Sequence, residues 1–232
     1  MKTKILANRL KGQRVKRLSF IFLSFYLLTS LNPAFADDKK SVEQSIRSSV
    51  NTVLDIIRNK ELNKETKKER VMVVIDKLFD IPLIAKLTLG RKHWPKLDEP
   101  QRKEFIRLFI KALQDSYFDK MDLLTDEVVE FDPPVQNDKK YTMSTYIVSK
   151  GKRYEILYKL YKEKNLWRVY DVEIEGISFV KSYSAQYDQF LQTYTVQKLL
   201  DKMREKTMEV PKELKSKEKE NKAEPSKEKP AP

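Results

Sequence analysis

The chain has 232 residues, of which 40% are hydrophobic, with 47 Lys and Arg against 34 Asp and Glu and a formal net charge of +13. It has no cysteine, which excludes disulfides, thiolate zinc sites and cysteine nucleophiles. Its single histidine excludes multi-histidine metal sites, and its four glycines leave little material for phosphate-cradling loops.

The first 36 residues have the composition of a secretory signal. They contain seven basic residues and no acidic ones, and an apolar run extends from Leu18 to Leu31. The run is too short to span a bilayer comfortably, and it leads to the A-x-A cleavage pattern at residues 34–36. We therefore predict a signal peptide over residues 1–36 that is cleaved after Ala36. The alternative is an uncleaved N-terminal anchor.

Residues 209–232 are rich in Lys, Glu and Pro and contain almost no apolar side chains. Such a composition cannot bury enough surface to offset its ordering entropy, so we predict a disordered tail. Between signal and tail, residues 37–208 carry 33 basic and 28 acidic side chains, a net charge of only +5. This excess gives little support to nucleic-acid binding and is compatible with mild attraction to anionic membranes. To test this attraction, the basic cluster to neutralise first is Lys150, Lys152 and Arg153.

Helical periodicity dominates the first half of the domain at residues 37–208. Apolar residues recur every three to four positions over 41–59, and a second apolar helix is predicted over 71–79, after a Lys- and Glu-rich turn at 60–69. The residues on the apolar face of the first helix are Val42, Ile46, Val50, Val53, Leu54 and Ile57.

Two further helices are predicted from the residues that cap their N-terminal ends. Asp80 has the character of an N-cap, with Pro82 in the first turn, and Gly90 is expected to end the short helix that follows. Asp98 and Gln101 have the spacing of a capping box. The helix that they start has an apolar face of Phe105, Leu108, Phe109, Ala112, Leu113 and Tyr117.

The period changes to two in the second half of the domain. This alternation predicts antiparallel strands over 141–147, 154–160 and 166–175, with 127–132 as a candidate edge strand. Helical periodicity returns from Ser178 onward. Helices, then a meander of strands, then helices again indicate an α+β domain. On the third strand we expect one face to carry Tyr170, Val172 and Ile174.

The third strand also carries Asp171, Glu173 and Glu175 at alternate positions, roughly 6.6 Å apart from strand rise. They allow an acid/base or metal cluster, but we favour a solvated face that pairs with Lys and Arg across strands. His93 is expected to be a surface or packing residue, because no orienting partner is evident. Metal-binding, phosphate-binding and serine-hydrolase motifs are absent from the sequence, so we do not expect an enzyme.

Residues 167–178, WRVYDVEIEGIS, closely resemble the W-R-V-Y-D-V-x-I-E-G-V-S signature of the MlaC family, the toluene-tolerance-type periplasmic phospholipid-binding proteins. The resemblance covers about residues 42–206. Ser184 stands where the family usually has Arg, and Tyr187 replaces a Phe. The usual glycine before the last helix is absent, and the tail exceeds the family's norm. Further landmarks in the family's order are Leu89, Gly90, Trp94, Pro100, Gln101, Arg102, Phe105, Phe109 and Tyr117.

The resemblance implies an NTF2-like cone, in which N-terminal helices pack on a curved antiparallel sheet of about four strands and enclose an apolar cavity, followed by C-terminal helices. It also implies a periplasmic carrier that shuttles phospholipid between outer and inner membranes and maintains outer-membrane lipid asymmetry. Its partners would be an outer-membrane lipoprotein–porin complex and an inner-membrane ABC transporter with a membrane-anchored substrate-binding ring. We expect a monomer with no catalytic residue, no metal and no cofactor other than the phospholipid cargo.

A chain reversal at Gly176 would return Ile177 to the face of Val172 and Ile174, which we place along the cavity wall. The expected lipid-binding residues are Ile177, Ile174, Val172, Tyr154, Ile156, Tyr158, Met143 and Tyr117. For Ile177, the alternative is an ordinary core position. For the whole protein, the alternatives are a carrier of another lipid, such as a hopanoid, and a secreted enzyme on a cone-shaped α+β scaffold.

Overall fold

The computed structural model describes residues 33–121, 127–149, 151–206 and 208–216. The described residues from Lys39 onward belong to one compact unit, and residues 33–38 belong to another. Most of the predicted signal peptide and the end of the predicted tail therefore lie outside the described residues.

Two N-terminal helices pack on one face of the sheet, α1 (Pro33–Arg58) and α2 (Lys64–Leu78). Helix α2 begins seven residues earlier than the sequence predicted, inside the stretch that we expected to be a turn. The reason is an N-cap, because the side chain of Asn63 accepts a hydrogen bond from the backbone N–H of Thr66 at 2.9 Å. The charged residues after Asn63 therefore form exposed first turns of a helix.

Helix α3 (Ile81–His93), a 3-10 turn η1 (Trp94–Lys96) and helix α4 (Glu99–Met121) follow. Both predicted helix starts are confirmed. Asp80 accepts a hydrogen bond from the N–H of Leu83 at 3.0 Å. Asp98 and Gln101 form a reciprocal capping box, with N–H to side-chain oxygen distances of 2.8 and 3.1 Å. Gly90 has φ of 64° and ψ of −176°, a non-helical conformation, so the helical turns that begin after Asp80 end there as predicted, and a further short helical stretch follows within the bounds of α3.

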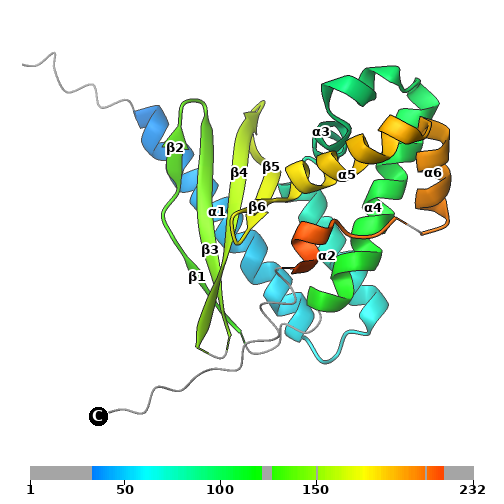
Figure 1. The fold of residues 1–232 in the computed structure, drawn as a ribbon. Helices are drawn as coiled ribbons and strands as arrows, with labels where there is room; N and C mark the ends of the chain where they lie inside the picture. The colour runs from blue at the N-terminus through cyan, green and yellow to red at the C-terminus, as the bar shows by residue number, and fades with distance from the viewer. Residues whose placement is uncertain (1–32, 122–126, 150, 207, 217–232) are drawn as a thin grey trace, which may run out of the picture. The chain divides into compact units, whose positions relative to one another are not determined.

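Among the described residues, the sheet is antiparallel and has six strands, in the order β1-β3-β4-β5-β6 with β2 also paired to β3 (Figure 1). The prediction of about four strands missed the two shortest, whose two or three residues are too few to show alternation. The strands are β1 (Val128–Phe131), β2 (Val135–Asn137), β3 (Lys140–Ser149), β4 (Lys152–Glu163), β5 (Leu166–Ile174) and β6 (Ile177–Ser178).

The chain reversal predicted at Gly176 is confirmed. Strands β5 and β6 form a hairpin in which Ile174 and Ile177 are directly opposite each other. The two residues between them, Glu175 and Gly176, have φ of 50° and 77°. Positive φ at both central positions identifies the type I′ turn, whose twist matches that of the flanking strands.

Strand β5 contains a bulge that changes which side chains share a face. Leu160 of β4 pairs with Val169, but Tyr158 pairs with Val172, so β5 has an extra residue between these two pairs. The prediction that Tyr170 shares a face with Val172 is therefore wrong. The Tyr170 ring lies 6.1 Å from that of Tyr161, whereas Val172 packs against the core between the sheet and the first helices.

The C-terminal helices α5 (Phe179–Thr193) and α6 (Val196–Arg204) pack with α3 and α4 around a second core, which is helical and rich in aromatic side chains (Figure 1). The shared core residues of these helices include Leu89, Phe105, Phe109, Tyr183, Tyr187, Leu199 and Leu200.

The prediction that disorder begins at residue 209 is wrong for residues 209–216. Leu214 is 3% exposed in the helical core, and Met208 and Val210 pack against the same core. Glu213 accepts a hydrogen bond from the hydroxyl of Ser182 at 3.1 Å. Leu214 lies in a short helical turn at residues 212–216, and Met208 and Val210 lie just before it. The average composition of the tail conceals these few apolar side chains.

Candidate functional site

An apolar pocket lies between the first two helices and the sheet, with a volume of about 220 Å³. Helix α1 contributes one wall, α2 a second, and strands β1, β3 and β4 a third. The lining residues are Ser49, Val50, Val53, Leu54, Ile57, Val74, Ile75, Leu78, Phe79, Val129, Thr145, Ile147, Ile156 and Tyr158. Nearly all are hydrocarbon or aromatic, so the pocket suits an apolar ligand.

The strand register brings together seven of the eight residues that we predicted to bind lipid. Residues directly opposite each other on neighbouring antiparallel strands share a face of the sheet. One row across β3, β4, β5 and β6 contains Thr145, Ile156, Ile174 and Ile177. The row on one side of it contains Met143, Tyr158 and Val172, and the row on the other side contains Ile147 and Tyr154. All three rows lie on the face that lines the pocket.

Two of the predicted residues, Ile156 and Tyr158, line the pocket itself. Met143 is 1% exposed in the core beside it, and Val172 packs against that core. The first row continues through Ile174 to Ile177, which is half-buried and also packs against the helical core.

Tyr117 lies apart from the other predicted residues. It is on α4, its ring is 6.1 Å from that of Phe179, and it does not belong to the pocket lining. The sequence analysis placed Tyr117 on the apolar face of its helix, and that position does not determine its neighbours in space.

The first helices were expected to enclose the cavity, but their residues were not named among the predicted lipid-binding residues. Val50, Val53, Leu54 and Ile57 were recognised as the apolar face of a helix, but nothing in the sequence separates a stripe that fills a core from one that borders a cavity. The same limit applies to α2, whose lining residues Val74, Ile75 and Leu78 lie within the stretch that was recognised as an apolar helix.

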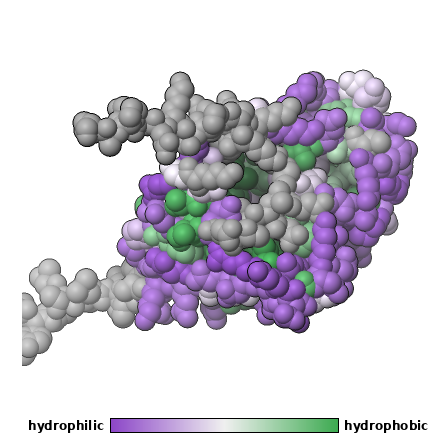
Figure 2. All heavy atoms as spheres, turned by 90° about the horizontal axis from the view of Figure 1, so that it is seen from below, coloured by the Kyte–Doolittle hydropathy of each residue, from purple (hydrophilic) through white to green (hydrophobic). Residues whose placement is uncertain are grey.

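Hydrophobic side chains are visible at the end of the domain where the β3–β4 hairpin lies. Seen from this end, hydrophobic atoms occur within a surface that is otherwise largely hydrophilic (Figure 2). The pocket-lining residues of α1 belong to its C-terminal half, which ends on this side of the sheet (Figure 1). The apolar pocket and the exposed apolar atoms therefore lie toward the same end.

Two buried hydroxyl groups interrupt the apolar wall. Thr145 on β3 and Tyr158 on β4 are 1% and 8% exposed, and their side chains hydrogen-bond to each other. Burial raises the pKa of Tyr158 above its usual value, although the bond from Thr145 opposes the shift. The phenol is therefore neutral at physiological pH and remains able to donate a hydrogen bond.

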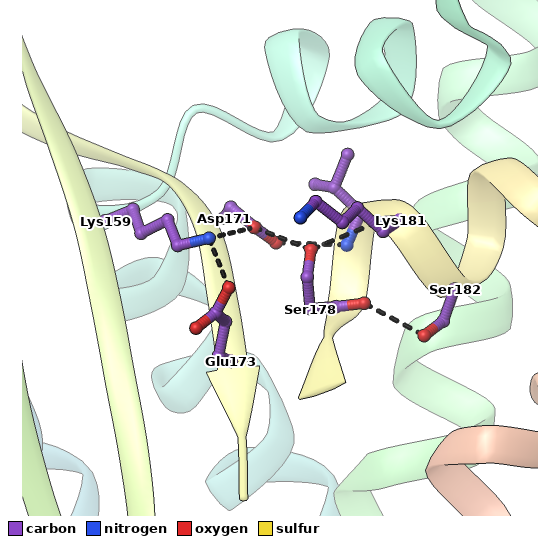
Figure 3. A network of polar contacts seen from close by, with 7 residues as sticks. Lys159, Asp171, Glu173, Ser178, Lys181 and Ser182 are labelled. Atoms are coloured by element: carbon purple, nitrogen blue, oxygen red, sulfur yellow. Dashed lines mark hydrogen bonds and ion pairs between the residues drawn. The ribbon is translucent and has the colours of Figure 1, made fainter. Parts of the chain in front are cut away.

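The carboxylates of β5 form a structural network and not an acid/base cluster (Figure 3). Asp171 is 6% exposed and accepts hydrogen bonds from the Ser178 hydroxyl at 2.7 Å and the Val180 N–H at 3.0 Å. Lys159 of β4 pairs with both Asp171 and Glu173. The prediction of pairing with Lys across strands is thus confirmed, whereas the predicted solvation is wrong for Asp171.

This network explains the spacing within the signature sequence. Ser178 is the N-cap of α5 and accepts a hydrogen bond from the N–H of Lys181 at 3.1 Å, while Asp171 holds the Ser178 hydroxyl. The type I′ turn between them returns the chain so that residues seven apart meet. Burial by itself would lower the pKa of Lys159, but its bonds to Glu173 and Asp171 outweigh burial and raise it.

His93 has an orienting partner, contrary to the sequence analysis. Its Nε2 lies 2.6 Å from Oδ1 of Asp188 on α5, and the same carboxylate binds Lys92 at 2.7 Å. These bonds, with Lys92 contributing most, lower the pKa of Asp188. His93 is buried in the helical half and does not line the pocket. Over the ranges that the structure describes, no three His, Asp or Glu residues are placed to hold a metal, and no helix is both long and apolar enough to cross a membrane.

A family model described as MlaC protein matches residues 47–205, which is more than half of the chain. Among solved structures, a phospholipid-binding protein from Ralstonia solanacearum in complex with a phospholipid is similar, with a TM-score of 0.65 and 20% sequence identity. The match covers 71% of this chain and 95% of that one. At this identity the likeness shows the fold, and it confirms the predicted α+β architecture. None of the curated proteins matches the chain.

Proposed function

Because the chain belongs to the MlaC family, we propose that it is a phospholipid-binding carrier whose pocket holds acyl chains. The observation that carries this proposal is the continuous apolar face formed by the pocket and the row from Ile156 through Ile174 to Ile177. The similar protein from Ralstonia solanacearum, which was solved with a phospholipid, supports the choice of cargo. The polar head group would remain outside this apolar wall.

The energetics of lipid transfer explain why a carrier needs a pocket and no catalytic group. A phospholipid with two acyl chains has about 30 methylenes, so moving it from a bilayer into water costs about 20 kcal/mol or more at ~0.8 kcal/mol per methylene. An apolar cavity replaces the bilayer and makes each transfer nearly isoenergetic. Hydrophobic burial is sufficient for this task.

The route of transport belongs to the same proposal. The basic and apolar leader at residues 1–36 supports export, and family membership supports the periplasm as its destination. There the carrier would shuttle phospholipid between an outer-membrane lipoprotein–porin complex and an inner-membrane ABC transporter with its membrane-anchored substrate-binding ring. Such traffic maintains the lipid asymmetry of the outer membrane.

Organic extraction of the purified protein, followed by mass spectrometry, tests the proposal directly. We expect phospholipid in stoichiometric amount. Extraction of a polycyclic lipid such as a hopanoid would identify that lipid, instead of phospholipid, as the cargo. A protein that neither contains lipid nor takes it up from vesicles would overturn the proposal.

A charge placed on the apolar face should remove the lipid. We expect Ile177→Glu to remain folded, because this half-buried position allows a carboxylate to hydrate, and to purify without lipid. The matched control is Leu166→Glu, which places the same charge on β5 at a side chain that is 65% exposed and outside the pocket lining. Circular dichroism establishes folding, and extraction measures the lipid. Full lipid content in folded Ile177→Glu would show that Ile177 is not part of the lipid-binding face.

A further inference from the structure

The wall of the pocket contains more polarity than hydrocarbon chains require. Thr145 and Tyr158 both line the pocket, are almost completely buried, and hydrogen-bond to each other. Val and Phe have nearly the same shapes as these two residues and avoid the cost of burying hydroxyl groups. A hydroxyl pair at this place therefore indicates a ligand with a polar atom inside the pocket.

The pair has one hydrogen-bond donor to spare. Two hydroxyl groups carry two protons, and the bond between Thr145 and Tyr158 uses only one of them. Within the described part of the chain, neither side chain has a second hydrogen-bond partner. A buried donor without an acceptor is unfavourable, so a ligand that supplies an acceptor gains affinity here. Ser49, the other hydroxyl in the lining, is half-exposed on α1 and carries no such burial cost.

We propose that the Thr145–Tyr158 pair donates a hydrogen bond to an ester carbonyl oxygen of the bound lipid, so that the pocket prefers ester-linked to ether-linked chains. This inference rests on the proposed function. The ester carbonyls of a glycerophospholipid join the acyl chains to glycerol and are its acceptors closest to the hydrocarbon. Ether-linked chains have the same hydrocarbon but no carbonyl, so they would leave the donor unpaired.

Competition between two lipids tests the inference. The protein is incubated with vesicles that contain equal amounts of diester and diether phosphatidylglycerol with matched chains, then repurified, and its lipid is quantified by mass spectrometry. One hydrogen bond of ordinary net strength predicts a preference of about two- to tenfold for the diester lipid. Tyr158→Phe should remove this preference and still bind lipid. The matched control, Tyr146→Phe, loses a hydroxyl on the same sheet that bonds Asp132 at 2.9 Å outside the pocket lining, and it should keep the preference.

A second variant, Thr145→Val, should reduce the preference because it removes the partner that holds the Tyr158 hydroxyl. It also keeps the test valid if Tyr158→Phe does not fold. Equal binding of both lipids by the unmodified protein, or an unchanged preference in folded Tyr158→Phe, would overturn the inference and leave the proposed function intact. Failure to take up either lipid would overturn both. A hydroxylated diether lipid that binds as well as the diester would assign the acceptor to a chain hydroxyl, and it would overturn the carbonyl assignment.

Discussion

Asp171 shows how one side chain can connect the two halves of the domain. Its carboxylate lies on β5, in the sheet, and accepts hydrogen bonds from Ser178 and Val180, which begin α5 in the helical half. The same carboxylate pairs with Lys159 of β4. A buried carboxylate with three partners is stable only while all of them stay in place, so it fixes the direction in which α5 leaves the sheet.

We predict that Asp171→Asn lowers the free energy of unfolding by about 1.5–3 kcal/mol, because hydrogen bonds to a buried charge are replaced by weaker neutral ones. Urea denaturation measures the change. Glu173→Gln is the matched control, since it also removes a carboxylate that pairs with Lys159 but leaves the start of α5 untouched, and its loss should be below about 1 kcal/mol. Equal losses in the two variants would show that the bonds to Ser178 and Val180 contribute little.

At the scale of elements, the segment at residues 208–216 belongs to the folded domain. Leu214 is buried, Met208 and Val210 pack against the helical core, and the side-chain amide of Gln186 donates a hydrogen bond to the carbonyl oxygen of Glu209 at 2.8 Å. The hydrogen bonds of this segment are made with Gln186 and Ser182 of α5, whose first turn is held by Asp171. The folded domain thus extends beyond Met208, where the sequence analysis ended it.

Two truncations test this boundary. Ending the chain after Met208 removes Leu214 from the core, and loss of a buried leucine typically costs about 2 kcal/mol or more, so we expect the melting temperature to fall by several degrees. Ending it after Ser216 removes only residues 217–232, which are rich in Lys, Glu and Pro, and the melting temperature should not change. Thermal unfolding followed by circular dichroism measures both. Identical melting temperatures for the two truncations would show that the folded domain ends at Met208.

At the scale of the whole molecule, the net charge does not show which cations are already paired with carboxylates. The domain at residues 37–208 carries only +5, and many of its cations are already paired. Arg153, which belongs to the predicted basic cluster, pairs with Glu130 at 2.7 Å and lies over the ring of Tyr146. Lys150 of that cluster lies outside the described residues.

We predict that the protein takes up lipid faster from anionic than from neutral vesicles, and that added salt reduces the difference, because a small positive excess attracts an anionic surface only over short distances. Transfer of a fluorescent lipid from vesicles measures the rates. Arg153→Gln should change them little, since this charge is shared with Glu130. Rates that do not depend on vesicle charge or ionic strength would contradict the prediction.

Local patterns were enough to predict most of the longer elements of the fold. Both predicted helix caps, the change from helical to strand periodicity and the turn at Gly176 depend on residues within a few positions of each other. Such interactions join residues that are close in the sequence, and the structure confirms them. The signature at residues 167–178 likewise allowed the family to be recognised from the sequence.

Contacts between distant residues were decided only by the tertiary structure. The bulge in β5 depends on the register with β4, so alternation alone placed Tyr170 on the wrong face. The pocket depends on the distance between α1, α2 and the sheet, and an apolar helical stripe has the same pattern whether it fills a core or borders a cavity. Leu214 is buried because the helical core leaves room for it, which its charged neighbours in the sequence do not reveal. The sequence therefore determined the elements and the family, and three-dimensional packing determined where the apolar faces meet and where they leave space.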